Sequence, residues 1–162
     1  MTDDPRAPVL EATIEIDVAP EKVWALVSDI EGMSSWSPQV VRSTVNGDTV
    51  GLGTTFTNEN HQGDVVWPTN ARVVRFEPPR DFAFKVKENR LIWSFQLEPL
   101  PGGGTRVTER REAPEGITDL SINFTEAYLG GVEEFTERQR SGMQETLERL
   151  KAEAEADPSQ KR

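Results

Sequence analysis

His61 is the residue of this chain whose type most directly suggests chemistry, because it is the only histidine and cysteine is absent. Imidazole is the side chain best suited to general acid–base catalysis near neutral pH. The surrounding segment 58–64 (NENHQGD) is polar and has turn character, which predicts a solvated hairpin tip. No positioned partner for His61 can be identified from the sequence. A catalytic histidine and a merely solvated one therefore both stay open.

Glu109 and Tyr128 are the other two catalytic candidates. Glu109 and Arg111 share one face of a predicted strand with Val107. If this face points inward, Glu109 and Arg111 can meet a polar group of a ligand, and each charge needs a counter-charge. If it points outward, both lie in solvent. We expect the outward orientation for Arg111, because antiparallel sheets commonly have one solvated face.

Metal and phosphate chemistry is not indicated. The lack of cysteine and the single histidine exclude thiolate and multi-histidine metal sites. The glycine run 102–104 is not followed by Lys-Ser/Thr, as a phosphate loop requires, and no G-x-S-x-G elbow occurs. The sequence predicts neither a metal site nor a cofactor.

Aromatic side chains are numerous enough to line a pocket for a flat apolar ligand. Taken singly, each is more often a core residue, because burying an aromatic ring is stabilising in itself. The predicted ligand-binding residues are Trp36, Phe56, Trp67, Phe84, Trp93, Phe95, Phe124, Tyr128 and Phe135, with Gln139 and Met143. Phe124, Tyr128 and the pair Gly130-Gly131 precede the last predicted helix, where we expect a lid or an entrance.

A series of short strands, followed by one long helix, must position these residues. Alternating polarity and turn-forming clusters predict strands at 9–18, 39–46, 53–60, 64–77, 80–88, 90–99 and 104–112. Short connections between consecutive strands imply antiparallel neighbours. Pro20, suited to the first position of a helix, predicts a short helix after the first strand, and a second is predicted at about 29–35. This order predicts an α+β fold.

The predicted C-terminal helix, 131–154, has an interrupted apolar face. Its apolar stripe consists of Val132, Phe135, Met143, Leu147, Leu150 and Ala154. Gln139, Gly142 and Thr146 occupy the centre of the stripe, where glycine costs about 1 kcal/mol relative to alanine and buried polar groups need partners. A helix that faces a hollow interior explains this composition. A rotated helix, or local hydrogen bonds of the two polar side chains, explains it equally well.

Composition and charge limit the classes of function. The 162 residues include 18 basic and 28 acidic ones, which gives a net charge of −10, and no segment forms a basic patch. Nucleic-acid binding and attraction to anionic membranes are therefore disfavoured, and no apolar run approaches the ~18 residues of a membrane span. We expect a cytoplasmic monomer or homodimer without a signal peptide. One domain is expected at 9–154, between disordered ends at 1–8 and 155–162.

Motifs spread over 9–154 resemble one protein superfamily. They are 19–24 (APEKVW), 29–38 (DIEGMSSWSP), Gly51 and Gly53 before Phe56 and Asn60, Trp67 followed by Val73, 77–84 (EPPRDFAF), and Trp93 through 103–109 (GGTRVTE). The chain resembles the helix-grip (SRPBCC) superfamily, which includes START lipid-transfer domains and proteins of the birch-pollen-allergen type. More narrowly, it is similar to bacterial polyketide cyclase/dehydrase and lipid-transport proteins.

This resemblance implies a fold and a type of site. The fold is a curved seven-stranded antiparallel sheet wrapped around a long C-terminal helix, with two short helices between strands one and two. The site is a cavity for a hydrophobic ligand, whose identity the resemblance does not fix. The family pattern includes a glutamate at the position of Glu109, which does not establish catalysis.

Three functions compete at this point. The first is binding of a hydrophobic or aromatic small molecule, lipid-like or polyketide-like, between the sheet and the C-terminal helix. The second is an enzyme of the polyketide cyclase, aromatase or dehydratase type, in which His61, Tyr128 or Glu109 would move protons while the cavity orients the substrate. The third is a protein-interaction module that uses the acidic N-terminal half as its contact surface.

Overall fold

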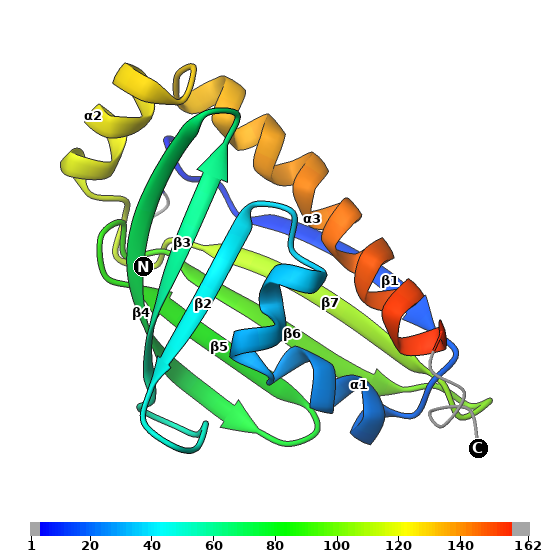
Figure 1. Ribbon diagram of the computed structural model, residues 1–162. Helices are drawn as coiled ribbons and strands as arrows, with labels where there is room; N and C mark the ends of the chain where they lie inside the picture. The colour runs from blue at the N-terminus through cyan, green and yellow to red at the C-terminus, as the bar shows by residue number, and fades with distance from the viewer. Residues whose placement is uncertain (1–3, 157–162) are drawn as a thin grey trace.

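A curved antiparallel sheet of seven strands is crossed by the long C-terminal helix α3 (Val132–Ala156), as Figure 1 shows. The computed structural model describes residues 4–156. The strands are β1 (Leu10–Ile16), β2 (Val40–Asn46), β3 (Thr55–Gln62), β4 (Val65–Glu77), β5 (Asp81–Val86), β6 (Ile92–Pro99) and β7 (Thr105–Glu112). Their order across the sheet is β1-β7-β6-β5-β4-β3-β2. The predicted α+β helix-grip fold is confirmed.

Alternation of side chains determines which face of each strand points inward. In β1, Leu10 and Ile16 are buried, whereas the charged residues between them are exposed. β1 pairs with β7, so that Ile14 lies opposite Val107, and the first strand of the chain thereby joins the last. Consecutive strands from β2 to β7 pair with one another, which agrees with the predicted antiparallel neighbours.

Two short helices connect β1 to β2, as the sequence predicts. Helix α1 (Pro20–Val27) has Pro20 in its first turn, where the missing N–H would have no helical partner in any case. The 3₁₀ helix η1 (Ile30–Ser35) follows. Val23, Val27 and Ile30 are buried against the sheet and complete one end of the core.

The closely packed core lies beneath the second half of α3. Leu147, Leu150 and Ala154 of this helix are fully buried in the same cluster as Phe82 of β5 and Val107 of β7. The first half of α3 contributes nothing to this cluster. The two halves of α3 therefore have different surroundings, and the functional site lies beneath the first half.

Helix α2 (Asp119–Tyr128) is an element that the sequence analysis left as an undefined segment before the last helix. Thr118 caps it, because its Oγ1 accepts a hydrogen bond from the backbone N–H of Ser121 at 3.2 Å. The same Oγ1 donates to the carbonyl oxygen of Glu88 at 2.6 Å. Figure 1 shows α2 at the end of the molecule where α3 begins. Within residues 4–156, no helix is long and apolar enough to cross a membrane.

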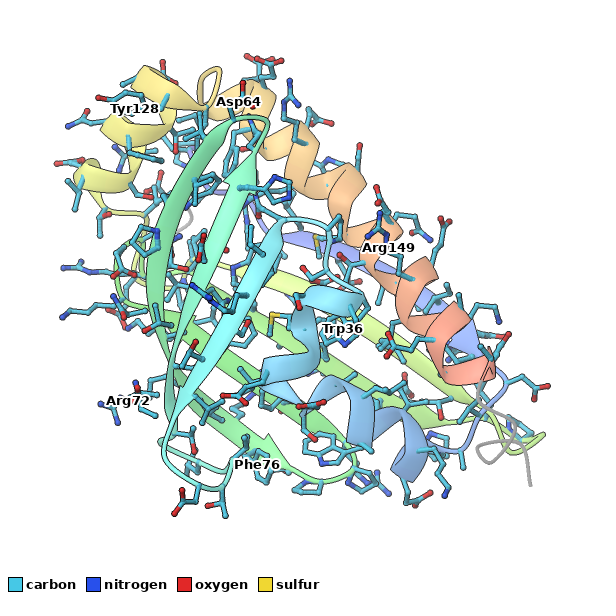
Figure 2. All side chains as sticks on the ribbon, viewed as in Figure 1. Trp36, Asp64, Arg72, Phe76, Tyr128 and Arg149 are labelled. Atoms are coloured by element: carbon cyan, nitrogen blue, oxygen red, sulfur yellow. The ribbon has the colours of Figure 1, made fainter. Side chains whose placement is uncertain are left out.

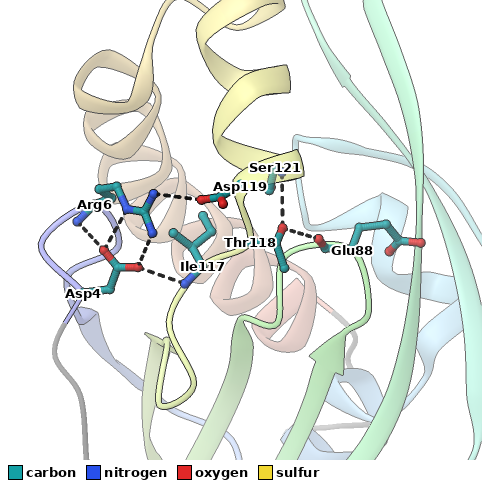
Figure 3. Close-up of polar contacts among 7 residues, drawn as sticks. All are labelled: Asp4, Arg6, Glu88, Ile117, Thr118, Asp119 and Ser121. Carbon is teal, nitrogen blue, oxygen red and sulfur yellow. Dashed lines mark hydrogen bonds and ion pairs between the residues drawn. The ribbon is translucent and has the colours of Figure 1, made fainter.

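Residues 4–8, which we call the N-terminal strap, are packed onto the fold (Figure 3). The Asp4 carboxylate pairs with Arg6 at 3.1 Å and accepts the backbone N–H of Ile117 at 3.1 Å. Arg6 also pairs with Asp119 at the start of α2. The hydrogen bonds from Arg6 and Ile117 hold the pKa of Asp4 well below its ordinary value. Part of the segment expected to be disordered, residues 4–8, thus makes specific contacts with the fold.

Further contacts fix both ends of the described chain. Ala7 is buried in a small cluster with Leu91 and Ala113. At the other end, α3 continues through Ala156, beyond the predicted helix end, and so includes two of the residues expected to be disordered. The rest of that expectation, at 1–3 and 157–162, falls outside the described residues.

Candidate functional site

A cavity of about 620 Å³ lies between the sheet and the first half of α3. Strands β3 to β7 line it from the sheet side, the segment after η1 and α2 contribute its sides, and α3 covers it. Sites for small molecules typically occupy about 300–1,000 Å³ and are mostly apolar with few polar groups. The volume is therefore suited to a small organic ligand.

Aromatic rings form much of the apolar wall. Trp67 of β4 lies beside Phe124 of α2, with ring centroids 5.7 Å apart, and beside Phe135 of α3 at 6.4 Å. Trp36 and Phe95 make an edge-to-face pair at 5.7 Å. Such pairs stabilise one another and hold rigid flat surfaces. Rings from five different segments are thus fixed around one space.

The structure separates the predicted ligand-binding residues into two groups. Nine of them line the cavity: Trp36, Trp67, Phe84, Trp93, Phe95, Phe124, Phe135, Gln139 and Met143. Phe56 and Tyr128 lie outside the lining. Phe56 is fully buried behind the wall, and its ring centroid lies 5.2 Å from that of Phe84. Tyr128 is 64% exposed on α2 (Figure 2). Tyr128 therefore sits outside the space in which it was expected to act.

The interrupted face of α3 lies over the cavity. Gln139, Gly142 and Thr146 all line it, together with Met143. A Cβ atom added to Gly142 would meet no atom within 4 Å. The central residues of the stripe thus border open space, while the apolar residues of the second half of α3 pack in the core.

Glu109 points inward from β7 and lines the cavity. Glu109 is 5% exposed, and its cross-strand neighbours are Ala12 and Phe95. Its Oε1 is buried with no hydrogen-bond partner. Burial raises the pKa of Glu109 from its ordinary 4.5 to about 8. At neutral pH this carboxyl group is accordingly protonated and can donate a hydrogen bond as well as accept one.

Arg111 corrects the expectation that this side chain lies in solvent. It is 3% exposed, and its guanidinium donates to the Oε1 of Gln139 and, at 2.7 Å, to the carbonyl oxygen of Pro8. Burial, and secondarily the positive charge of Arg140, lowers the pKa of Arg111 to about 10. The guanidinium therefore stays charged at neutral pH. It joins α3 to the N-terminal strap and does not line the cavity.

His61 also differs from its predicted setting. It belongs to strand β3 rather than to the hairpin tip, and it lines the cavity. Its Nε2 lies 3.0 Å from the carbonyl oxygen of Pro38. A carbonyl oxygen can only accept, so Nε2 is the donor in this bond. This bond connects β3 to the segment that follows η1.

Polar residues of β3 complete the wall and were missed in the sequence. Asn58 and Asn60 alternate with Phe56 on the inward face and line the cavity. Asn58 Oδ1 accepts from Ser43 Oγ at 2.6 Å, and Asn60 Nδ2 donates to Thr69 at 2.9 Å. The alternation with Phe56 was the available signal, since residues two apart in a strand share a face.

Within the described part of the chain, no group of three or more His, Cys, Asp or Glu residues is arranged to hold a metal ion.

Comparisons with known proteins cover nearly the whole chain. A family model described as "Polyketide cyclase / dehydrase and lipid transport" matches residues 7–155. A search of curated proteins finds no match. Among solved structures, the Polyketide_cyc-like protein Cgl2372 from Corynebacterium glutamicum is 28% identical, with a TM-score of 0.61, and the match covers 94% of this chain and 96% of that one.

Two more distant structures share the fold. The di-domain ARO/CYC StfQ of the steffimycin biosynthetic pathway is 15% identical with a TM-score of 0.71, and the match covers 91% of this chain and 50% of StfQ. The Aha1 dimer from Colwellia psychrerythraea is 18% identical with a TM-score of 0.59, over 89% of this chain and 93% of that one. These similarities concern the arrangement of the backbone.

Proposed function

The chain belongs to the polyketide cyclase/dehydrase and lipid-transport family, and on that basis we propose that it binds a hydrophobic, ring-containing small molecule in the cavity beneath α3. The observation that carries this proposal is the unfilled face of α3 at Gly142, where an added Cβ atom would meet nothing within 4 Å. If α3 packed directly on the sheet here, an apolar side chain at position 142 would gain van der Waals contacts that glycine cannot make. The open space beside a glycine in mid-helix is instead available to a ligand.

The shape of the wall supports a ligand with flat rings. Trp36, Trp67 and Trp93 line the cavity along with four phenylalanine rings. Aromatic walls favour flat apolar molecules, because stacked and edge-to-face ring contacts add to the burial of apolar area. Binding of this kind needs no catalytic group.

The proposal is tested by titration with prodan, a neutral dimethylaminonaphthalene ketone whose fluorescence depends on the polarity around it. We expect saturable binding, with energy transfer from the tryptophans to the bound probe. Gly142→Leu should lower the affinity about tenfold or more, because its side chain occupies the space beneath α3. Its thermal stability should not fall, since leucine is a better helix former than glycine.

Gln144→Leu is the matched control. Gln144 is exposed on α3 and does not line the cavity. It receives the same side chain as Gly142 and should leave prodan binding unchanged. Equal affinities of the wild-type protein and Gly142→Leu would show that the probe binds elsewhere and would contradict the proposal.

A second candidate function, proton transfer to a bound polyketide-like substrate, is favoured by Glu109. A carboxyl group that keeps its proton at neutral pH in an apolar cavity has the properties of a general acid. Incubation with a linear poly-β-ketone, followed by mass spectrometry, tests this function. Loss of one water per turnover by the wild-type protein, but not by Glu109→Gln, would support a dehydratase or aromatase. Equal product formation by both proteins would exclude Glu109 as the acid.

A further inference from the structure

The cavity combines a buried carboxyl group with a wall that offers no unpaired cation. We propose that this cavity selects a neutral, oxygen-bearing ligand whose carbonyl or hydroxyl group hydrogen-bonds with Glu109. It rejects molecules that carry a carboxylate. This inference rests on the proposed binding function. The ligand class is thus an uncharged ketone, alcohol or ester rather than a fatty acid.

The first step concerns the position of Glu109. Its side chain rises from β7 between Phe95 and Ala12 of the neighbouring strands, with Val107 and Arg111 two positions away on the same face. Oε1 is buried without a hydrogen-bond partner. An unpaired polar atom in an apolar site is costly until it finds a partner. Glu109 also lines the cavity, so a ligand oxygen there can hydrogen-bond with its carboxyl group.

The second step concerns the positive charges near the cavity. Among the described residues that line the cavity, Arg138 is the one arginine, and there is no lysine. Its Nη2 lies 3.2 Å from Glu134 Oε1. Arg111 donates to the neutral groups of Gln139 and Pro8; its Nε is buried without a partner, but the residue does not line the space. No cation within the described lining is therefore free to pair with an incoming anion.

The third step concerns the negative charges. Glu134, Glu137 and Glu145 on α3 line the cavity in addition to Glu109. These three side chains are each paired with an arginine of the same helix, as in the 2.6 Å pair of Glu145 and Arg149. These pairs compensate one another at the exposed side of α3, whereas a ligand carboxylate beside Glu109 would be buried without a counter-ion. Burial of an unpaired charge is strongly unfavourable.

The opposite wall provides neutral hydrogen-bonding groups instead. Asn58 uses its Oδ1 for Ser43, and Asn60 uses its Nδ2 for Thr69. His61 uses Nε2 for the carbonyl oxygen of Pro38. The amide and imidazole groups of this wall can therefore orient a ligand that carries hydroxyl or carbonyl groups.

The test compares prodan with the corresponding dimethylaminonaphthoate, in which a carboxylate replaces the ketone on the same ring system, and with the methyl ester of that acid. Dissociation constants are measured from the fluorescence of each compound at neutral pH. We expect the dissociation constants of the ketone and the ester to be lower than that of the carboxylate by about tenfold or more. The ester controls for the size of the substituent.

The role of Glu109 is tested with two variants. Glu109→Leu should weaken prodan binding about three- to tenfold, the usual effect of losing one hydrogen bond. Glu109→Gln, which retains a hydrogen-bonding group, should largely preserve it. Dimethylaminonaphthalene, which has the ring but no carbonyl, should bind both variants and the wild-type protein alike. An equal effect of Glu109→Leu on both compounds would overturn the proposed hydrogen bond.

The outcomes separate this inference from the function on which it rests. Carboxylate binding equal to or tighter than that of the ketone would overturn the selection by charge, while the cavity would remain a binding site. If none of the compounds bound to the wild-type protein, the proposed binding function would fail, and the selection with it.

Discussion

Glu109→Gln is expected to abolish a large part of the pH dependence of stability. Burial raises the pKa of this carboxyl group from 4.5 to about 8. The folded protein therefore holds a proton that the unfolded chain releases at a lower pH. The stabilising contribution is fully present below the ordinary pKa and is lost as the pH rises toward the raised value, so the free energy of unfolding must fall in that window.

The magnitude follows from the two pKa values. Between them, each unit of pH lowers the free energy of unfolding by about 1.4 kcal/mol. Raising the pH from about 5 to about 8 should therefore cost the wild-type protein about 3 kcal/mol through this group alone. Arg111 lies two positions away on the same face of β7, but its guanidinium donates hydrogen bonds to Gln139 and Pro8. Glutamine has no proton to lose, so the variant should lack this loss.

Urea denaturation at a series of pH values measures the effect. The two proteins should have similar stabilities at about pH 5, and Glu109→Gln should be more stable by about 3 kcal/mol at about pH 8. Their difference isolates Glu109, because all other titrating groups are common to both. Parallel stability curves over this range would show that Glu109 is ionised in the folded protein, and the argument from its burial would be refuted.

Two further perturbations test contacts outside the cavity. Arg111→Lys cannot reproduce the two bonds from one guanidinium to Gln139 and Pro8, and we expect it to lower the free energy of unfolding by about 1–3 kcal/mol in urea titrations; an unchanged midpoint would show that these bonds contribute nothing. Asp4→Ala removes the acceptor of the Ile117 N–H, so hydrogen exchange at that amide should accelerate, and unaltered exchange would mean that the N-terminal strap does not depend on Asp4.

Local sequence patterns predicted the strands, the two short helices between β1 and β2, and α3. The alternation in β1 and the position of Pro20 predicted elements that the structure contains, because both signals act over a few residues. Helix α2 escaped prediction, since Thr125 is its one buried residue and apolar Leu120 is exposed, so its sequence carries no regular apolar stripe.

The candidate site was predictable where the signal lay within one element. Gln139, Gly142 and Thr146 interrupt the stripe of a single helix, and all three line the cavity. Arg111 was misjudged because its partners, Gln139 and Pro8, are 28 and 103 residues away along the chain. In an alternating strand, the neighbouring residues do not show whether a charged side chain is exposed to solvent or buried with partners distant in sequence.

The pairing of β1 with β7 has a consequence for biosynthesis. Ile16 ends β1, yet its partner Thr105 belongs to the last strand, and α3, which packs along β1, is made later still. On the ribosome, the first strand must therefore wait with an open edge until most of the nascent chain has emerged. Contacts this distant in sequence slow folding, and an uncovered edge can pair with another chain. Newly made molecules are thus expected to depend on chaperones during this interval more than after the sheet has closed.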